Sequence, residues 1–180
     1  MSNARNDTES STAPLDESSR PAPNRSIIVG IDGSCASIEA LRYAASLAPA
    51  IGRPLFALAV WDYPPFLYGG YYPVMDWAPE DDAVKVLRAA SEAVFDDEPP
   101  AWFTWSPRQG RPAKVLIDES AGAEMLVVGS RGHGGFAALL LGSVSAACAE
   151  HAQCPVLVVH PRVAAPSIRG TDASIADAPM

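Results

Sequence analysis

The sequence has few of the features that define several large classes of protein. It contains only three cysteines among 180 residues, an odd number at unrelated spacings, which is not the pattern of a disulfide framework and favours a reducing compartment. No apolar run approaches the roughly 20 residues that a membrane-spanning helix needs. The N-terminus is polar and lacks the apolar stretch of a signal peptide. We therefore expect a cytoplasmic protein that makes no contact with a membrane.

Basic residues are also scarce. The chain has 13 Lys and Arg against 21 Asp and Glu, a formal net charge of −8, and its sequence pI is about 4.7. Binding to a phosphate backbone requires clustered Lys and Arg, so this balance argues against a nucleic-acid partner. A single basic side chain beside a small phosphorylated ligand is compatible with an acidic whole.

Core-forming residues are missing from both ends of the chain. Residues 1–24 are rich in Ser, Thr, Asp, Glu and Pro, and residues 162–180 are similar with more Ala and Pro. Such segments cannot bury enough apolar surface to offset the cost of ordering them, so we expect two disordered tails. Residues 25–161 remain, a length that suits one globular domain.

Within residues 25–161, apolar segments of strand length alternate with segments of helical periodicity. The expected strands are residues 26–31, 55–60, 101–106, 125–128 and 155–160, and the expected helices begin near Ser34, Pro79, Pro112 and Ser143. Pro49 and Gly52 should end the first helix, and the fourth should run to Gln153. This alternation is typical of right-handed βαβ units, which form a parallel sheet with helices on both faces. The fold class is therefore α/β, although periodicity does not determine the strand order.

A long irregular segment, residues 61–79, interrupts this alternation and is crowded with Trp, Tyr, Phe and Pro. Two interpretations are open. Its rings pack back onto the domain, as aromatic side chains commonly do, or the segment forms a lid or a contact between subunits, as long loops in compact domains often do.

The chemistry is concentrated in a glycine-rich stretch, Gly129-Ser130-Arg131-Gly132-His133-Gly134-Gly135, followed by Gly142-Ser143-Val144-Ser145. An apolar strand enters this stretch and a helix leaves it. Glycines allow backbone N–H groups to converge on a ligand, and a helix N-terminus adds free N–H groups and the positive end of its dipole. This arrangement predicts a phosphate-bearing ligand.

The spacing of these glycines distinguishes the motif from two common nucleotide fingerprints. A P-loop requires lysine where Gly142 stands, and the dinucleotide motif follows the first strand of its fold. The spacing G-x2-G-x9-G-S instead resembles the nucleotide-binding motif of the universal stress protein family, in its ATP-binding branch. Gly30-Ile31-Asp32-Gly33-Ser34 and Cys154-Pro155-Val156-Leu157-Val158-Val159 support this resemblance, which covers about residues 26–160.

The resemblance implies a fold and a position for the site. The fold is a single Rossmann-like domain of the adenine nucleotide alpha hydrolase type, an open parallel sheet of five strands in the order 3-2-1-4-5. In that order the direction of the chain reverses between the first and fourth strands, where ligands bind beyond the carboxyl ends. The turn at Asp32 and the turn at Gly129 follow those two strands.

The resemblance also implies the site residues. The expected nucleotide contacts are Asp32, Gly33, Ser34, Val60, Gly129, Ser130, Arg131, Gly132, Gly142, Ser143, Val144 and Ser145. Val60 would contact adenine through its backbone, and the glycines and serines would hold ribose and phosphates. Asp32 is either turn chemistry or a nucleotide contact that binds Mg²⁺ through ATP. The Arg131 side chain either meets phosphate or points to solvent.

Cys148, His151 and Cys154 recur at intervals of three residues and raise the question of a metal site. They lie on or just after one helix and offer three ligands where a structural zinc site has four. We favour ordinary packing of the cysteines as small buried side chains.

The function that the resemblance implies is that of an ATP-binding stress-response regulator, which acts through its conformation or its partners. Nucleophilic catalysis has little support, because the chain contains no G-x-S-x-G elbow and no Ser-His-Asp order. A slow ATPase or adenine-nucleotide hydrolase and a nucleotide-independent dimeric scaffold remain alternatives. The last strand, residues 155–160, should lie at a sheet edge, where unpaired backbone groups invite pairing. The resemblance implies that it pairs across a homodimer.

Overall fold

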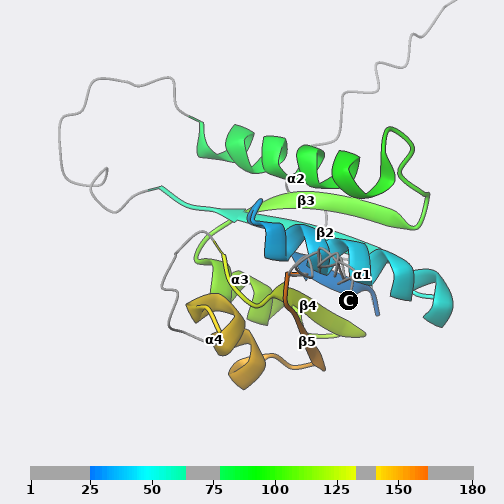
Figure 1. Ribbon diagram of the computed structural model, residues 1–180. Coiled ribbons are helices and arrows are strands. Elements are labelled where there is room, and N and C mark those ends of the chain that lie inside the picture. Colours follow the sequence, from blue (N-terminus) through cyan, green and yellow to red (C-terminus); the bar gives the residue numbers. More distant parts are fainter. Residues whose placement is uncertain (1–24, 64–77, 133–140, 162–180) are drawn as a thin grey trace, which may run out of the picture.

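The computed structural model describes residues 25–63, 78–132 and 141–161. The two expected tails, most of the aromatic segment and residues 133–140 of the glycine-rich stretch lie outside these residues. The described part forms alternating strands and helices throughout (Figure 1).

Five parallel strands form one open sheet in the order β3-β2-β1-β4-β5. The strands are β1 (Ile27–Gly30), β2 (Leu55–Trp61), β3 (Phe103–Gln109), β4 (Met125–Gly129) and β5 (Val156–Val159). In the central register Ile27 lies between Leu55 of β2 and Met125 of β4. The expected Rossmann-like fold and its 3-2-1-4-5 strand order are therefore confirmed.

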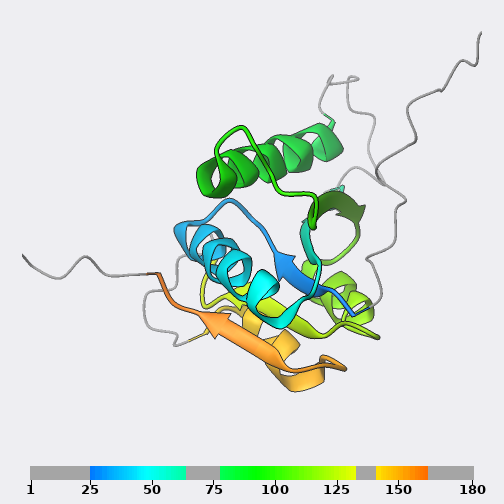
Figure 2. The same cartoon turned by 90° about the vertical axis from the view of Figure 1, so that its right-hand side faces the viewer.

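Within the described residues, four helices cover the two faces of this sheet, and Figure 2 shows their arrangement. They are α1 (Cys35–Ile51), α2 (Pro79–Phe95), α3 (Pro112–Glu119) and α4 (Ser143–His151). Ile27 and Val29 of β1 pack in one core with α1 and α2, whereas Ile28 packs in a second core with Leu116 of α3 and Cys148 of α4. Because both faces are covered, the central strands are continuously apolar rather than alternating.

Helix α1 begins and ends as its sequence predicts, with one exception. Ser34 is its N-cap and accepts a hydrogen bond from the Ser37 N–H, and Gly52 follows the last turn with φ of 64°. Pro49 was expected to end the helix together with Gly52, but it lies inside the last turn. A proline there removes one intrahelical hydrogen bond, and the helix continues only to Ile51. Helix α4 also ends earlier than expected, at His151 instead of Gln153.

The third strand is displaced from its expected position, residues 101–106, to Phe103–Gln109. The second half of this strand is polar, so the strand does not stand out as an apolar segment in the sequence. Arg108 forms an ion pair with Glu119 of α3 at 3.1 Å and lies over the Phe56 ring, 5.7 Å from its centroid. Pro107 is accommodated because β3 is an edge strand, paired with β2 alone. The partners of Arg108 and the edge position that accommodates Pro107 cannot be recognised from the sequence of the strand itself.

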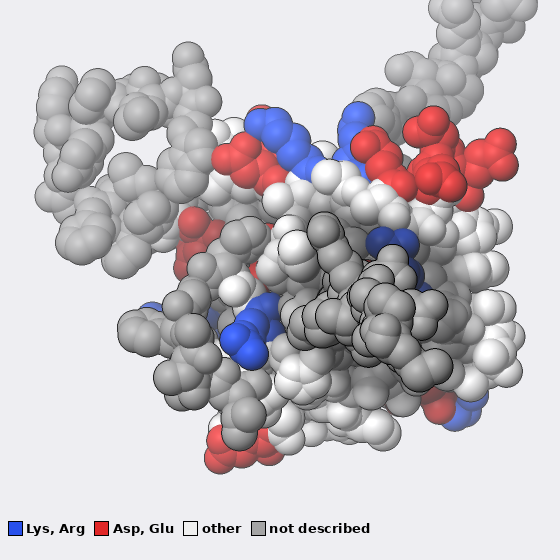
Figure 3. All heavy atoms as spheres, viewed as in Figure 1, with Lys and Arg blue, Asp and Glu red and all other residues white. Residues whose placement is uncertain are grey.

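Acidic side chains gather along the upper edge of the molecule in the view of Figure 3, over α2. Glu80, Asp81 and Asp82 lie in the first turn of this helix, where negative charge interacts favourably with the helix dipole.

Within the described ranges, no helix is long and apolar enough to cross a membrane.

Candidate functional site

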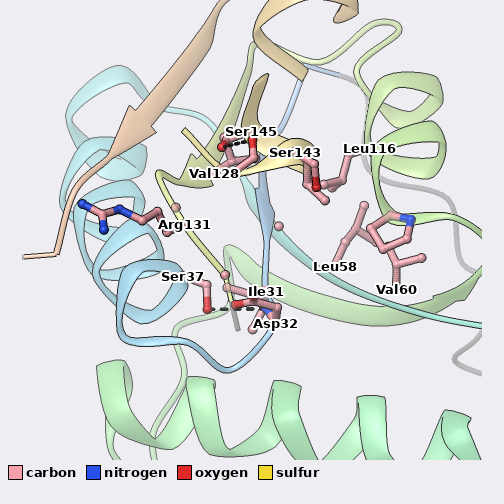
Figure 4. Close-up of a pocket in the computed structure, with 16 residues that line it drawn as sticks. Ile31, Asp32, Ser37, Leu58, Val60, Leu116, Val128, Arg131, Ser143 and Ser145 are labelled. Atoms are coloured by element: carbon pink, nitrogen blue, oxygen red, sulfur yellow. Dashed lines mark hydrogen bonds between the residues drawn. The ribbon is translucent and has the colours of Figure 1, made fainter. Parts of the chain in front are cut away.

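The strand order creates a pocket where the chain leaves β1 toward one face of the sheet and β4 toward the other. Its volume is about 250 Å³, and it lies beyond the carboxyl ends of β1, β2 and β4, against the N-termini of α3 and α4 (Figure 4). It is lined by Gly30, Ile31, Asp32, Ser37, Leu58, Val60, Pro112, Leu116, Val128, Gly129, Arg131, Gly132, Gly142, Ser143, Val144 and Ser145.

Most of the residues expected from the sequence meet in this pocket. Asp32, Val60, Gly129, Arg131, Gly132, Gly142, Ser143, Val144 and Ser145 all line it. Gly33, Ser34 and Ser130 are not among the lining residues. Gly33 has φ of 83°, which allows the turn that leads into α1. Ser130 is fully buried, and its N–H donates to the carbonyl of Val159 at 2.7 Å.

The N-terminus of α4 supplies hydrogen-bond donors to the pocket. Gly142 is the N-cap of this helix, and it has no side chain with which to cap it. The first backbone bond of the helix runs from the Ala146 N–H to the Gly142 carbonyl, at 2.9 Å. The N–H groups of Ser143, Val144 and Ser145 therefore have no partner within the helix. Together with the helix dipole they can bind an anion.

Two glycines of the motif are required by close packing. A Cβ atom at Gly129 would lie 2.8 Å from the backbone carbon of Ala36 and 2.9 Å from the nitrogen of Ser37. Glycine at this position thus lets α1 approach β4. A Cβ atom at Gly132 would collide with Oδ2 of Asp32, so glycine here brings the turn after β4 against the turn after β1.

Asp32 joins these two turns. Its Oδ1 accepts hydrogen bonds from the N–H of Ser34 at 3.0 Å and from the Ser34 hydroxyl at 2.6 Å. The same hydroxyl lies 3.4 Å from the carbonyl oxygen of Arg131. Asp32 is therefore both a turn residue and a lining residue of the pocket, and the two interpretations of the sequence are compatible.

The side chain of Arg131 points away from the pocket, toward α1, while its backbone lines the cavity (Figure 4). The residue is exposed. Of the two alternatives left open by the sequence, the described geometry matches a side chain directed to solvent. Among the described residues, the donors that this pocket could offer to an anion are therefore backbone N–H groups rather than this guanidinium.

The sequence did not identify the apolar wall of the pocket. Leu58 of β2 and Leu116 of α3 are almost fully buried and line the cavity, together with Pro112. A Cβ atom at Gly30 would lie 3.0 Å from a methyl group of Leu116, so this glycine makes room for that side chain. Leu58 could have been found, because residues two apart on a strand share a face and Val60 was expected in the site.

The cysteines pack as small apolar side chains. Cys148 is fully buried between the sheet and the helices α3 and α4, and Cys154 packs against the same core. Burial raises the pKa of the Cys148 thiol to about 11 and also raises that of Cys154. Protonated thiols are poor metal ligands. No cluster of three or more His, Cys, Asp and Glu side chains in the described part of the chain could hold a metal ion.

The fold and the pocket define an α/β protein with a glycine-rich turn at the crossover of a parallel sheet. Residues 23–160 match the model of the universal stress protein family, and the chain belongs to that family. It is 36% identical over 141 residues to a universal stress protein of Mycolicibacterium smegmatis. It is also 36% identical over 155 residues to the universal stress protein Rv1996 of Mycobacterium tuberculosis.

These alignments cover 76% and 81% of this chain but only 46% and 48% of the two relatives. The chain thus spans about half of their length. Among solved structures, UspA of Lactobacillus plantarum is similar with a TM-score of 0.62 and 24% identity, over 77% of this chain and 99% of that one. A universal stress protein in complex with cAMP is similar with a TM-score of 0.56 and 26% identity, over 78% of this chain and all of that one.

Proposed function

We propose that this chain binds ATP together with Mg²⁺ and acts as a nucleotide-dependent regulator of a stress response, through its conformation or its partners. The observation that carries this proposal is the N-terminus of α4, where Gly142 provides no side-chain cap and the residues of the first turn line a pocket at the crossover of the sheet. The similar protein in complex with cAMP supports an adenine nucleotide as the ligand class.

The two ends of the pocket suit the two ends of a nucleotide. Leu58, Leu116 and Pro112 provide an apolar wall for a base, with the backbone of Val60 available to its polar edge. The glycine turn after β4 and the first turn of α4 provide donors for phosphates. A purine stacked against the wall would therefore direct its phosphates toward α4.

The carboxylate of Asp32 lies against Gly132, next to the proposed phosphate position. A carboxylate and a phosphate that lie next to each other repel unless a cation lies between them. Magnesium is bound in many nucleotide sites by a carboxylate and phosphate oxygens. We therefore assign Asp32 to Mg²⁺ that enters with ATP, and expect ATP to bind more tightly with Mg²⁺ than without it.

The test has two parts. Freshly purified protein is denatured and any released nucleotide is identified, and nucleotide-free protein is titrated with ATP in the presence and absence of Mg²⁺. The control is the double variant Gly132→Val, Ser143→Ala, since a side chain at Gly132 would displace Asp32. ATP that is released or bound by the natural protein, and lost in the variant, supports the proposal. If neither part detects nucleotide, the proposal fails and a scaffold role remains.

We also propose a homodimer formed through β5. This strand is at the edge of the sheet, pairs with β4 alone, and all four of its residues, Val156–Val159, are only half-buried. An apolar edge strand with free backbone groups is a template for pairing with a second copy. We further assign residues 25–161 as the universal stress protein domain, and the cytoplasm as its compartment.

A further inference from the structure

The two serines at the start of α4 differ in what their hydroxyls contact. Ser143 is exposed and lines the pocket. Ser145 is 3% exposed, and its Oγ lies 3.1 Å from the carbonyl oxygen of Ser130 and 3.0 Å from that of Gly142 (Figure 4). A carbonyl oxygen can only accept, so the single proton of the Ser145 hydroxyl is directed to the backbone.

The carbonyl of Ser130, at the end of β4, contacts two groups from the start of α4. Besides the Ser145 hydroxyl, it accepts the N–H of Gly142 at 2.8 Å. Ser130 itself is fixed at the end of the sheet, because its N–H donates to Val159 of β5. These contacts attach the first turn of α4 to the end of β4.

We propose that Ser145 is a positioning residue that holds the first turn of α4 against the end of β4, whereas Ser143 keeps the phosphate contact expected from the sequence. This inference rests on the proposed function. To donate to a phosphate, the Ser145 hydroxyl would have to give up the carbonyls of Ser130 and Gly142, which share its one proton, and its side chain is only 3% exposed. Among the described residues, no carbonyl holds the Ser143 hydroxyl in this way, and Ser143 lies in the first turn of α4 beside N–H groups that have no partner within the helix.

The first test uses the ligand-free protein and measures hydrogen exchange of the Gly142 amide by NMR. We expect Ser145→Ala to raise its exchange rate roughly fivefold, from the loss of one typical hydrogen bond. Ser145→Thr, which keeps the hydroxyl, should restore the slow rate, and Ser143→Ala should not change it. Ser46→Ala is the matched control: the Ser46 hydroxyl donates to the Tyr43 carbonyl three residues earlier at 2.7 Å, on an exposed part of α1.

The second test titrates the same variants with Mg²⁺-ATP and with adenosine, which lacks phosphates. We expect Ser143→Ala to weaken ATP roughly tenfold, the loss of one charge-assisted hydrogen bond, and to leave adenosine unchanged. Ser145→Ala should also weaken ATP, and Ser145→Thr should restore it.

An unchanged exchange rate of Gly142 in Ser145→Ala would overturn the positioning role, as would failure of Ser145→Thr to restore ATP affinity. Unchanged ATP affinity in Ser143→Ala would overturn the phosphate contact. If the natural protein binds neither ligand, the proposed function and the role of Ser143 fail together. The exchange experiment then still decides whether Ser145 holds the first turn of α4 against the end of β4.

Discussion

Replacing Gly142 by aspartate should stabilise the protein and strongly weaken its affinity for ATP. Gly142 already has the backbone conformation of an N-cap, with φ −72° and ψ 162°. Ser34, which does cap α1 with its side chain, has nearly the same angles, −70° and 156°. A Cβ atom at Gly142 would have its nearest neighbours at 3.6 Å, an ordinary contact. A side chain therefore fits without strain.

The two effects of this substitution have opposite signs. An aspartate cap accepts an N–H of the first turn and places negative charge at the helix N-terminus, which should raise the free energy of unfolding by about 0.5–2 kcal/mol. The same carboxylate accepts a hydrogen bond from an N–H group that would otherwise donate to phosphate. Two unit charges about 5 Å apart, at an effective dielectric constant near 20, repel by about 3 kcal/mol. We therefore expect ATP affinity to fall by roughly a hundredfold or more.

Urea unfolding of the nucleotide-free protein measures the first effect, and calorimetric titration with Mg²⁺-ATP measures the second. Gly142→Asn is the matched control, because it caps equally well without charge. It should give a similar gain in stability and a smaller loss of affinity. A Gly142→Asp variant that is more stable and still binds ATP as tightly as the natural protein would show that the phosphates do not lie at α4. The reasoning would then be wrong.

Three further predictions concern packing, reactivity and assembly. Gly129→Ala should lower the free energy of unfolding by about 1–3 kcal/mol, since its Cβ would press on the backbone of α1; an unchanged urea midpoint would contradict this. At pH 8, iodoacetamide should label exposed Cys35 and spare buried Cys148, whose pKa of about 11 leaves little thiolate until the pH approaches that value. Equal labelling by mass spectrometry would refute the burial argument. Sedimentation at micromolar concentration should detect a dimer that Val158→Lys in β5 dissociates, and a monomeric natural protein would exclude the β5 contact.

Much of the fold could be predicted because its signals are local. Continuous apolar segments identify strands that are buried on both faces, and Ser34 and Gly52 mark the ends of α1 through backbone chemistry that needs no distant partner. Strand β3 was misplaced because Arg108 depends on Glu119 and on the Phe56 ring, which lie on other elements. A polar residue in a strand is recognisable only once its partners are known.

The sequence by itself determined that this chain has a strand, a glycine turn and a helix start in succession, since glycine spacing and apolar runs express what the backbone must do locally. It also located the two turns that meet in the pocket, once the resemblance had supplied the strand order. Only the tertiary structure decided that Leu58 and Leu116 form the apolar wall. It alone separated Ser145, directed to buried carbonyls, from the exposed Ser143. The physical reason is that the environment of a side chain depends on segments far apart in the chain, which the local pattern does not encode.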